Sequence, residues 1–363
     1  MKKLFPVLLV LIILFSFTGC EKKETIDIAI ILTEVKILDN NNFLGAALDG
    51  VKRFAEGTNY SYKEYFPADS TAEDYRECVE DAIDSGAKIM VMPGYLLETV
   101  TLEAQERYPQ VKFILLDGIP NNGAYDETRV EEIAGNTYSV LYAEEQAGFL
   151  AGYAAVYDGY RKLGFFGGMS VPAVQRFGYG YMQGAEYAAG ELELDQDSIE
   201  MRYLYCTSFN PAPEYQARAS LWYHQGTEVI FACGGAMGQS VIQASIDADA
   251  KVIGVDTDQS GDSDTVITSA LKMISESVYQ ALHEWDEGEF RGGHGEHLGA
   301  DVGGVGLSME TSRFRTFTQA DYDRIYSELA SNAEGITANI LKDDADIFDI
   351  PLSRVQLIFE KLR

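Results

Sequence analysis

Short apolar runs alternate with longer segments of helical spacing along most of this chain. The apolar runs end in Gly, Pro or Asp and read IDIAIILTE (26–34), AKIMVMPG (87–94), VKFILLDG (111–118), KLGFFGG (162–168), TEVIFACGG (227–235) and KVIGVDTD (251–258). Such short runs are typical of strands that are buried on both faces. The segments of helical spacing cover residues 44–55, 72–85, 96–107, 143–157, 177–189, 213–225 and 238–248. This alternation predicts βαβ units and parallel sheets.

The predicted strands and helices form two sets, one before about residue 135 and one after about residue 160. The polar, glycine-led stretch GNTYSVLYAEEQ (135–146) lies between them and is interpreted as the crossing. We therefore expect two similar, doubly wound α/β lobes that face each other across a cleft. Functional groups in such folds gather at the carboxyl ends of the strands. Here those ends read MPG, LDG, FGGM, ACGG and VDTDQ, which combine glycine with acidic side chains.

The first twenty residues differ from the rest of the chain. Two lysines precede the apolar run LFPVLLVLIILFSF (4–17), which is short for a membrane span, and a pair of small residues then leads to Cys20. This arrangement resembles a bacterial lipoprotein signal, in which residues 1–19 are removed and Cys20 carries the lipid. The alternative is a plain secretory signal. Both predict an exported protein, with residues 20–25 as a polar tether.

Composition narrows the classes of partner. The chain has 363 residues, of which 46% are hydrophobic, enough for two domains with sizeable cores. Its 57 acidic residues outnumber the 28 basic ones, so the surface should repel the phosphates of nucleic acids and of anionic lipids. Nucleic acid is therefore not an expected partner. Beyond Cys20, the residues Cys78, Cys206 and Cys233 show no CxxC spacing, and we expect buried apolar side chains or one disulfide.

Catalytic, metal and dinucleotide chemistry lack a supporting motif. No GxSxG occurs, and the four histidines are absent from the predicted strand ends, so no Ser–His or Cys–His pair is indicated. His294 and His297 lie three residues apart in a glycine-rich loop without a third ligand. GYGYMQG (178–184) resembles GxGxxG but has one residue too many and falls inside a helical pattern. We predict no cofactor, no metal and no catalysis.

An exported, two-lobed α/β protein without a catalytic set fits a non-covalent binding cleft. Seven stretches carry a more specific resemblance: GAALDGVKRF, VKFILLDG, AEEQAGFLAGYAA, KLGFFGGMSVPAVQRFGYGYMQG, VIFACGG, VIGVDTDQ and VITSALK. In this order they resemble the basic membrane protein family of ABC-transporter receptors, the nucleoside-binding lipoproteins related to the purine nucleoside receptor of spirochaetes. The resemblance covers about residues 26–308. It implies a type I periplasmic-binding-protein fold whose lobes are joined by three crossing segments.

This fold implies how the chain divides. We expect the N-terminal lobe over residues 26–137 and 270–297, and the C-terminal lobe over residues 138–269 and 298–363. The stretch RGGHGEHLGADVGGVGLS (291–308) is rich in glycine and then β-like, which suits a segment that returns the chain to one lobe. Two helical patterns follow it. We expect the protein to act as a monomer.

The family's binding site, carried over residue by residue, begins with two aromatic rings. Phe43 matches the aromatic residue just before the first helix, and Phe231 of VIFACGG matches a ring on the opposite lobe. Two such rings sandwich a flat base, and each stack contributes on the order of 1 kcal/mol. The pattern alone favours a core position for Phe231, because it lies within a buried run. Both interpretations stay open at this point.

Polar groups complete the site that the resemblance implies. Asp256, the first acid of VDTD, matches the acceptor of the ribose hydroxyls, and Lys272 of TSALK matches a lysine that donates to the sugar and keeps that carboxylate charged. A turn residue and a surface cation are the alternatives for these two positions. The remaining members are cleft-edge side chains or glycines that allow the backbone to approach the ligand, namely Asp117, Met169, Gly234 and Gly235.

The stretch DNNNFLGAALDG (39–50) departs from the family pattern. The family usually has an acid three residues before the aromatic ring, but that position is Asn40 here, Asn42 stands in place of a serine, and Asp39 lies one residue earlier. An amide both donates and accepts hydrogen bonds, whereas a carboxylate only accepts them. We therefore expect these three residues to alter the base preference. Asn42 is also a suitable N-cap for the following helix.

Together, these observations predict an extracytoplasmic receptor at the outer face of the bacterial cytoplasmic membrane. It captures a nucleoside, with a purine favoured, delivers it to an ABC-transporter permease, and is anchored by lipid at Cys20. One alternative is a receptor of the same fold for a sugar or a signalling molecule. Another is a nucleoside-processing enzyme, which needs a general acid or a nucleophile at the site.

Overall fold

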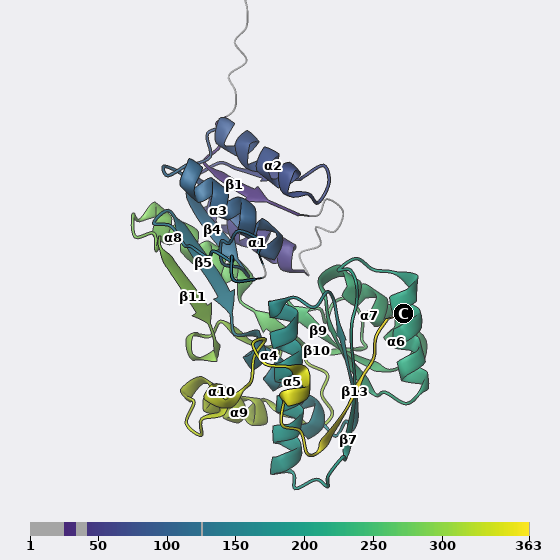
Figure 1. The fold of residues 1–363 in the computed structure, drawn as a ribbon. Coiled ribbons are helices and arrows are strands. Elements are labelled where there is room, and N and C mark those ends of the chain that lie inside the picture. The colour runs from purple at the N-terminus through teal and green to yellow at the C-terminus, as the bar shows by residue number, and fades with distance from the viewer. Residues whose placement is uncertain (1–24, 34–41, 125, 363) are drawn as a thin grey trace, which may run out of the picture.

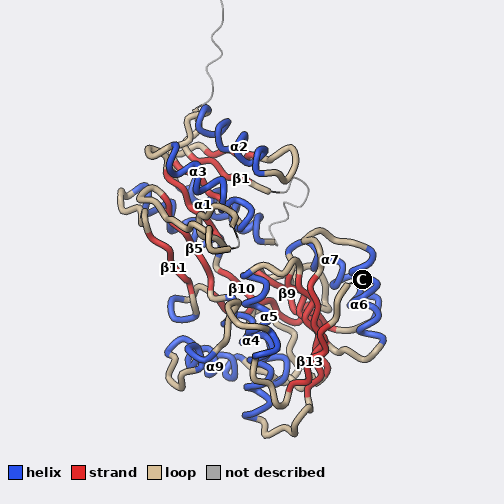
Figure 2. The backbone as a smooth tube through the Cα atoms, viewed as in Figure 1, coloured by secondary structure: helices blue, strands red, loops and turns tan. Residues whose placement is uncertain are grey.

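The computed structural model describes residues 25–33, 42–124 and 126–362. This part of the chain forms two α/β lobes, each built on one sheet with helices on both faces (Figures 1 and 2). Each of the seven predicted helical segments overlaps a helix, and each of the six apolar runs contains a strand. The predicted alternation of parallel strands and helices is therefore confirmed.

The N-terminal lobe contains a sheet of six parallel strands in the order β11-β5-β4-β3-β1-β2. Its strands are β1 (Ile28–Ile31), β2 (Tyr62–Tyr65), β3 (Ile89–Pro93), β4 (Lys112–Leu116), β5 (Thr137–Tyr142) and β11 (His294–Leu298). Its helices are α1 (Phe43–Gly57), η1 (Tyr95–Leu97), α2 (Ala72–Asp84), α3 (Glu98–Arg107) and α8 (Ile274–Asp286). Alternate residues of β1 enter different cores, Ile28 and Ile30 with α1 and α8, and Ala29 and Ile31 with α2 and α3. Burial on both faces explains why this strand reads as a continuous apolar run.

The C-terminal lobe contains a sheet of seven strands in the order β12-β10-β9-β8-β6-β7-β13, of which only the β10–β12 pair is antiparallel. Its strands are β6 (Lys162–Gly167), β7 (Ile199–Tyr205), β8 (Val229–Cys233), β9 (Lys251–Asp256), β10 (Val266–Lys272), β12 (Val305–Leu307) and β13 (Val355–Phe359). Its longer helices are α4 (Glu144–Tyr157), α5 (Pro172–Glu191), α6 (Pro213–His224), α7 (Gly238–Ala248), α9 (Gln319–Ser331) and α10 (Ile336–Asn339). The short ones are η2 (Gly235–Met237), η3 (Ala300–Val302) and η4 (Ile347–Asp349).

The chain passes between the lobes three times. It leaves the first sheet after β5, returns after β10, and leaves again after β11. The predicted lobe boundaries follow residues 137, 269 and 297, whereas the strands at these boundaries end at Tyr142, Lys272 and Leu298. Both stretches interpreted as connectors contain strands of the first sheet: β5 pairs with β4, and β11 pairs with β5.

Glycines bring α4 and α5 into close contact. A Cβ atom on Gly180 would lie 2.0 Å from the carbonyl oxygen of Glu145, and one on Gly184 would lie 1.9 Å from that of Phe149. Gly148 of α4 meets the backbone of α5 in the same way. Only glycine permits backbones to approach this closely. The GxGxxG-like stretch at residues 178–184 is thus a helix-packing surface.

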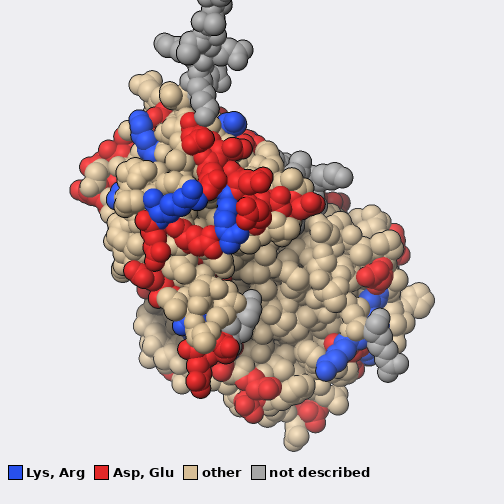
Figure 3. All heavy atoms as spheres, turned by 45° about the horizontal axis from the view of Figure 1, so that its top comes forward, with Lys and Arg blue, Asp and Glu red and all other residues tan. Residues whose placement is uncertain are grey.

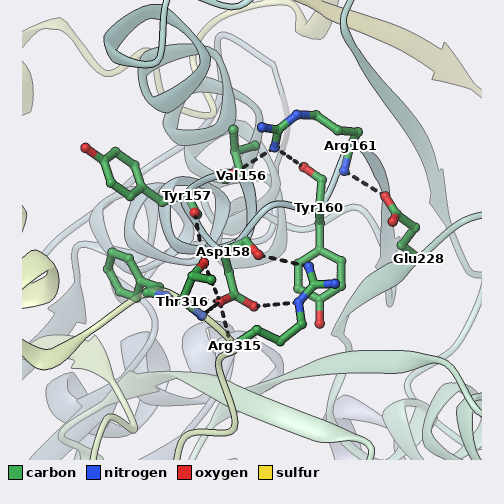
Figure 4. Close-up of polar contacts among 9 residues, drawn as sticks. Val156, Tyr157, Asp158, Tyr160, Arg161, Glu228, Arg315 and Thr316 are labelled. Carbon is green, nitrogen blue, oxygen red and sulfur yellow. Dashed lines mark hydrogen bonds and ion pairs between the residues drawn. The ribbon is translucent and has the colours of Figure 1, made fainter.

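A buried carboxylate holds the segment that follows β12. Asp158, directly after α4, has a side chain with no exposed surface. Its Oδ1 accepts hydrogen bonds from the backbone N–H groups of Arg315, Thr316 and Phe317, at 2.6, 2.5 and 3.0 Å (Figure 4). The Arg315 guanidinium lies over the ring of Tyr160, 4.0 Å from its centroid. These contacts dock the chain onto the end of α4 before it enters α9.

Charged side chains crowd the surface of the N-terminal lobe. In Figure 3 acidic residues cover much of this lobe, with basic ones among them, while the C-terminal lobe in the same view is mostly uncharged. Pairs between α2 and α3 belong to this surface, for example Arg76 with Glu103 at 2.5 Å. Such exposed pairs contribute about 0 to 1 kcal/mol each, so the cores rather than the surface hold the lobe together.

The three cysteines of the described chain lie in the cores of the lobes. Cys78, Cys206 and Cys233 are buried and form no disulfide with one another. Burial raises the pKa of Cys206 to about 12 and that of Cys78 to about 11. Among the described residues, no helix is both long and apolar enough to cross a membrane.

Candidate functional site

Two aspartates from different lobes stand at the carboxyl ends of their strands. Asp117 follows β4 directly, and Asp256 is the last residue of β9. Both adopt the left-handed backbone conformation, with φ of 54° and 66°. This conformation is uncommon for residues other than glycine, and such strained residues cluster at binding and active sites.

Lys272 joins these two carboxylates. It ends β10, one residue beyond Leu271, which pairs with Asp256 in the register of the two strands. Its Nζ lies 2.5 Å from Oδ2 of Asp117 and 3.2 Å from Oδ1 of Asp256. The lysine side chain is 2% exposed, and each aspartate side chain is 11% exposed. The carboxylates therefore keep some accessible surface beside a buried ammonium group, which is the arrangement that a ligand carrying hydroxyl groups requires.

A third carboxylate lies behind the lysine. Oε1 of Glu144, the first residue of α4, is 3.7 Å from Nζ of Lys272, and its other oxygen accepts a hydrogen bond of 2.7 Å from Nε of Arg176. Burial raises the pKa of Glu144 to about 7, although Arg176 opposes the shift. Burial also raises the pKa of Asp256, against the effect of Lys272. For Lys272 itself, burial disfavours the charge, but the three carboxylates outweigh it and raise the pKa.

Aromatic rings surround the lysine. Its Nζ lies 4.7 Å from the ring centroid of Phe43, 5.3 Å from that of Tyr142 and 5.7 Å from that of Phe177. Phe43 begins α1, whose N-cap is Asn42: its side-chain oxygen accepts a hydrogen bond of 2.9 Å from the N–H of Gly45. The cap fixes the start of the helix and with it the half-buried ring. An aromatic face therefore lies beside the carboxylates.

Comparison with known families identifies the chain. The family model described as Bmp, ABC transporter substrate-binding protein PnrA-like, matches residues 28–341. The chain belongs to this family. It is accordingly a substrate-binding protein of the ABC-transporter type, and this membership favours binding over catalysis.

Curated relatives agree with this assignment to the Bmp family. The "ABC transporter nucleoside-binding protein BmpA" of Lactococcus lactis subsp. cremoris is 26% identical over 321 residues, covering 81% of this chain and 85% of the relative. "Basic membrane protein B" of Borreliella burgdorferi is 28% identical over 301 residues, covering 81% of this chain and 84% of the relative.

Solved structures of similar shape confirm the fold. An ABC transporter system solute-binding protein from Aeropyrum pernix K1 superposes with a TM-score of 0.70 at 24% identity, covering 86% of this chain and 92% of that one. One from Conexibacter woesei gives 0.65 at 20% identity, covering 85% and 97%. At these identities the likeness shows the fold alone. It supports the predicted type I periplasmic-binding-protein architecture.

Phe231, the second wall of the predicted sandwich, lies in the core. Its side chain in β8 has no exposed surface. The rings of Phe165, Phe177 and Tyr181 surround it, with centroids 5.3 to 5.8 Å away. The strand alternates between the two faces of a covered sheet, so the ring points into the packing between β8 and α5. The structure therefore does not bring Phe231 to the ring of Phe43.

Other predicted residues lie around the site to different degrees. Gly234 packs against Gly168, and a Cβ atom on it would lie 2.8 Å from the amide nitrogen of Gly168. Gly235 has a φ of +54°, and a Cβ atom there would meet nothing within 4 Å. Met169 is half-buried in the turn after β6, where its carbonyl accepts a hydrogen bond from Val171. Asp39 and Asn40 lie outside the described residues.

Sequence reasoning missed the residues behind the lysine. Glu144, Arg176, Tyr142 and Phe177 were not among the predicted site residues. One signal was present, because the acidic pair of AEEQ opens a segment that is otherwise apolar on every side, and a helix buried all round exposes no charge to water. The described residues contain no group of three or more His, Cys, Asp or Glu side chains that could hold a metal ion.

Proposed function

We propose that this protein binds a nucleoside, with a purine favoured, in the space around Lys272 and delivers it to the permease of an ABC transporter. The observation that carries the proposal is the pairing of Asp117 and Asp256, from opposite lobes, on one buried ammonium beside the ring of Phe43. A carboxylate accepts both vicinal hydroxyls of a ribose, and a ring face accepts a planar base. The name of the Lactococcus relative supports the same class of ligand.

The aromatic partner of Phe43 on the C-terminal lobe is Phe209 in this proposal. Phe209 follows β7 in the C-terminal lobe, and its ring centroid lies 6.4 Å from that of Tyr95 in the N-terminal lobe. Tyr95 follows Gly94, where a Cβ atom would lie 3.7 Å from Cε1 of Phe43. All three rings are half-buried, which leaves surface for a base. They replace the core residue Phe231 as the aromatic part of the site.

Ligand contacts from both lobes favour a closed arrangement, because each lobe alone satisfies only part of the ligand. Residues 1–20 support export and lipid anchoring at Cys20, which would hold the receptor at the outer face of the cytoplasmic membrane, near its permease. Asn40 and Asn42 stay the positions where we expect the base preference to differ from that of relatives.

Isothermal titration calorimetry of the chain from residue 21 tests the proposal. We expect adenosine, guanosine or inosine to bind, with ribose and the free bases binding at least about a hundredfold more weakly, since each supplies only half of the contacts. Binding of a free sugar with no heat from any nucleoside would overturn the proposal in favour of a sugar receptor. Release of free base during incubation would indicate an enzyme instead.

Two variants test the aromatic part. Phe43→Ala and Phe209→Ala should each weaken nucleoside binding about tenfold, the loss of roughly one stacking contact. Phe348→Ala is the matched control, because this ring is 70% exposed in η4 of the C-terminal segment. Unchanged affinity in both cleft variants would contradict the assigned stacking residues.

A further inference from the structure

A series of charges of alternating sign runs from the C-terminal segment to the centre of the site. Asp343 Oδ2 lies 3.2 Å from Nη1 of Arg176, Nε of Arg176 lies 2.7 Å from Glu144, and Glu144 Oε1 lies 3.7 Å from Nζ of Lys272. Lys272 then meets Asp117 and Asp256. This series of charges thus joins four parts of the fold: the segment after α10, helix α5, the start of α4, and the ends of the strands.

The inner side chains of this series of charges are buried. The side chains of Arg176, Glu144 and Lys272 are 10%, 0% and 2% exposed, whereas that of Asp343 is 26% exposed. Transfer of such charges from water is costly, and a buried ion pair often adds no net stability compared with apolar residues of the same size. Stability therefore gives no reason for these charges, and their position behind Lys272 suggests another role.

The packing around the charged side chains holds them in place. The close glycine contact of α4 with α5 sets Glu144 beside Arg176. The C-terminal segment is held to α5 by a pair of hydrogen bonds between Gln183 and the backbone of Leu341, at 2.8 and 2.9 Å. Asp343 follows two residues later, just beyond the region that matches the family model. Glu144, Arg176 and Asp343 are thus all carried by packed parts of the C-terminal lobe.

We propose that Glu144 and Arg176 are positioning residues of the binding site, which with Asp343 hold the Lys272 ammonium between Asp117 and Asp256. Oε1 of Glu144 is buried and accepts no hydrogen bond from the described residues, so above the raised pKa of this group its charge acts on the ammonium that lies nearest to it. Arg176 keeps Glu144 in this orientation, and Asp343 does the same for Arg176. The affinity for ligand then depends on residues that never touch it. This inference rests on the proposed role of Lys272 and Asp256.

The binding test compares variants of the mature chain, with adenosine as the probe. Glu144→Gln and Arg176→Met should weaken adenosine binding about tenfold, the effect of one lost charge-assisted contact. Arg176→Lys should restore most of the affinity, and Asp343→Asn should cause a smaller loss of about threefold. Lys342→Gln is the matched control, because the ammonium of Lys342 pairs with Glu145 at 3.1 Å, one residue away from Glu144 of this series of charges. The adenosine affinity of this variant should stay within about twofold of the wild-type value.

Crystal structures without ligand provide the second readout. In Glu144→Gln the Lys272 ammonium should leave its position between the two aspartates, whereas in Lys342→Gln it should stay. An unmoved ammonium, or an Arg176→Lys variant as weak as Arg176→Met, would overturn the inference. If the wild-type protein binds no nucleoside, the proposed function fails, but the position of the ammonium in the two variants still decides this inference.

Discussion

Asp117 and Asp256 occupy equivalent places in the two lobes. Each ends a central strand, each adopts a left-handed backbone conformation, and each turns its carboxylate onto the same ammonium group. Asp tolerates this conformation better than most residues, because its short side chain can form local hydrogen bonds. The strain is compensated by the surrounding sheet, and the result is a pair of partly accessible acceptors.

The raised pKa of Asp256 has a consequence for binding. Burial makes its carboxyl hold a proton at a higher pH than an ordinary Asp does, and hydroxyl donors need the charged form. Adenosine affinity should therefore be greatest above this raised pKa and fall as the pH drops through it. Asp256→Asn should weaken binding at pH 7 by about tenfold to a hundredfold and leave only the pH dependence that comes from Glu144, whose pKa is about 7. Calorimetry between pH 5 and 8 on both proteins measures the effect, and a parallel pH dependence in the variant would contradict it.

The pairing of α4 with α5 is the central contact between elements. Glycines on both helices remove the side chains that would separate them, and the two backbones touch. This contact explains why a stretch with three glycines in seven residues forms a stable helix here, although glycine disfavours helices by about 1 kcal/mol per residue. The tertiary contact outweighs the local preference.

Gly180→Ala should destabilise the protein. The added methyl group would meet the carbonyl oxygen of Glu145 at 2.0 Å, so α4 and α5 must separate, at a cost of about 2 kcal/mol or more. Gly190→Ala is the matched control in the same helix, since its Cβ atom would meet nothing closer than 3.9 Å. We expect it to be neutral or to stabilise by about 0.5 to 1 kcal/mol. Thermal unfolding of both variants measures the difference, and equal melting temperatures would refute the packing argument.

The link from α4 to the C-terminal segment depends on one side chain. Asp158→Asn keeps the shape but replaces the charged acceptor of three backbone N–H groups, so we expect a loss of about 2 to 3 kcal/mol. Asp323→Asn, on the exposed surface of α9, should change stability by less than about 0.5 kcal/mol. Urea unfolding curves compare the two. A loss no greater than that of the control would show that the buried carboxylate does not hold the segment.

The whole molecule consists of two covered sheets joined by three short connections, with a binding site that draws on both. A ligand that contacts both lobes should lower the radius of gyration in solution, because the contacts of each lobe are complete only when the lobes approach. Small-angle X-ray scattering with and without adenosine measures this change. At an adenosine concentration below its raised Kd, the Asp256→Asn variant should keep the larger radius of gyration. An identical radius for the free and bound wild-type protein would contradict closure.

The sequence predicts the order of elements well because strands buried on both faces carry an unbroken apolar signal, as in IAII of β1. It predicts the other strands less well. YKEY of β2 lies at the edge of its sheet, and β5 begins within the polar stretch GNT, so neither shows that signal. At the site, Phe43, Asp117, Asp256 and Lys272 come together as the family resemblance implies. Phe231 differs because one position in a strand decides which face a ring points to, and only tertiary contacts reveal which face meets the ligand.

The three connections between the lobes have a mechanical consequence. Ala143 before α4 and Met273 before α8 share nearly the same backbone torsions, with φ and ψ of −84° and 69° for the first, and −81° and 54° for the second. Since α4 is locked to α5, and α8 packs on α1, neither helix can absorb a rotation within itself. Rotation of one lobe against the other must therefore change the backbone torsions at these connections, and one of them, at Met273, directly follows Lys272 of the site.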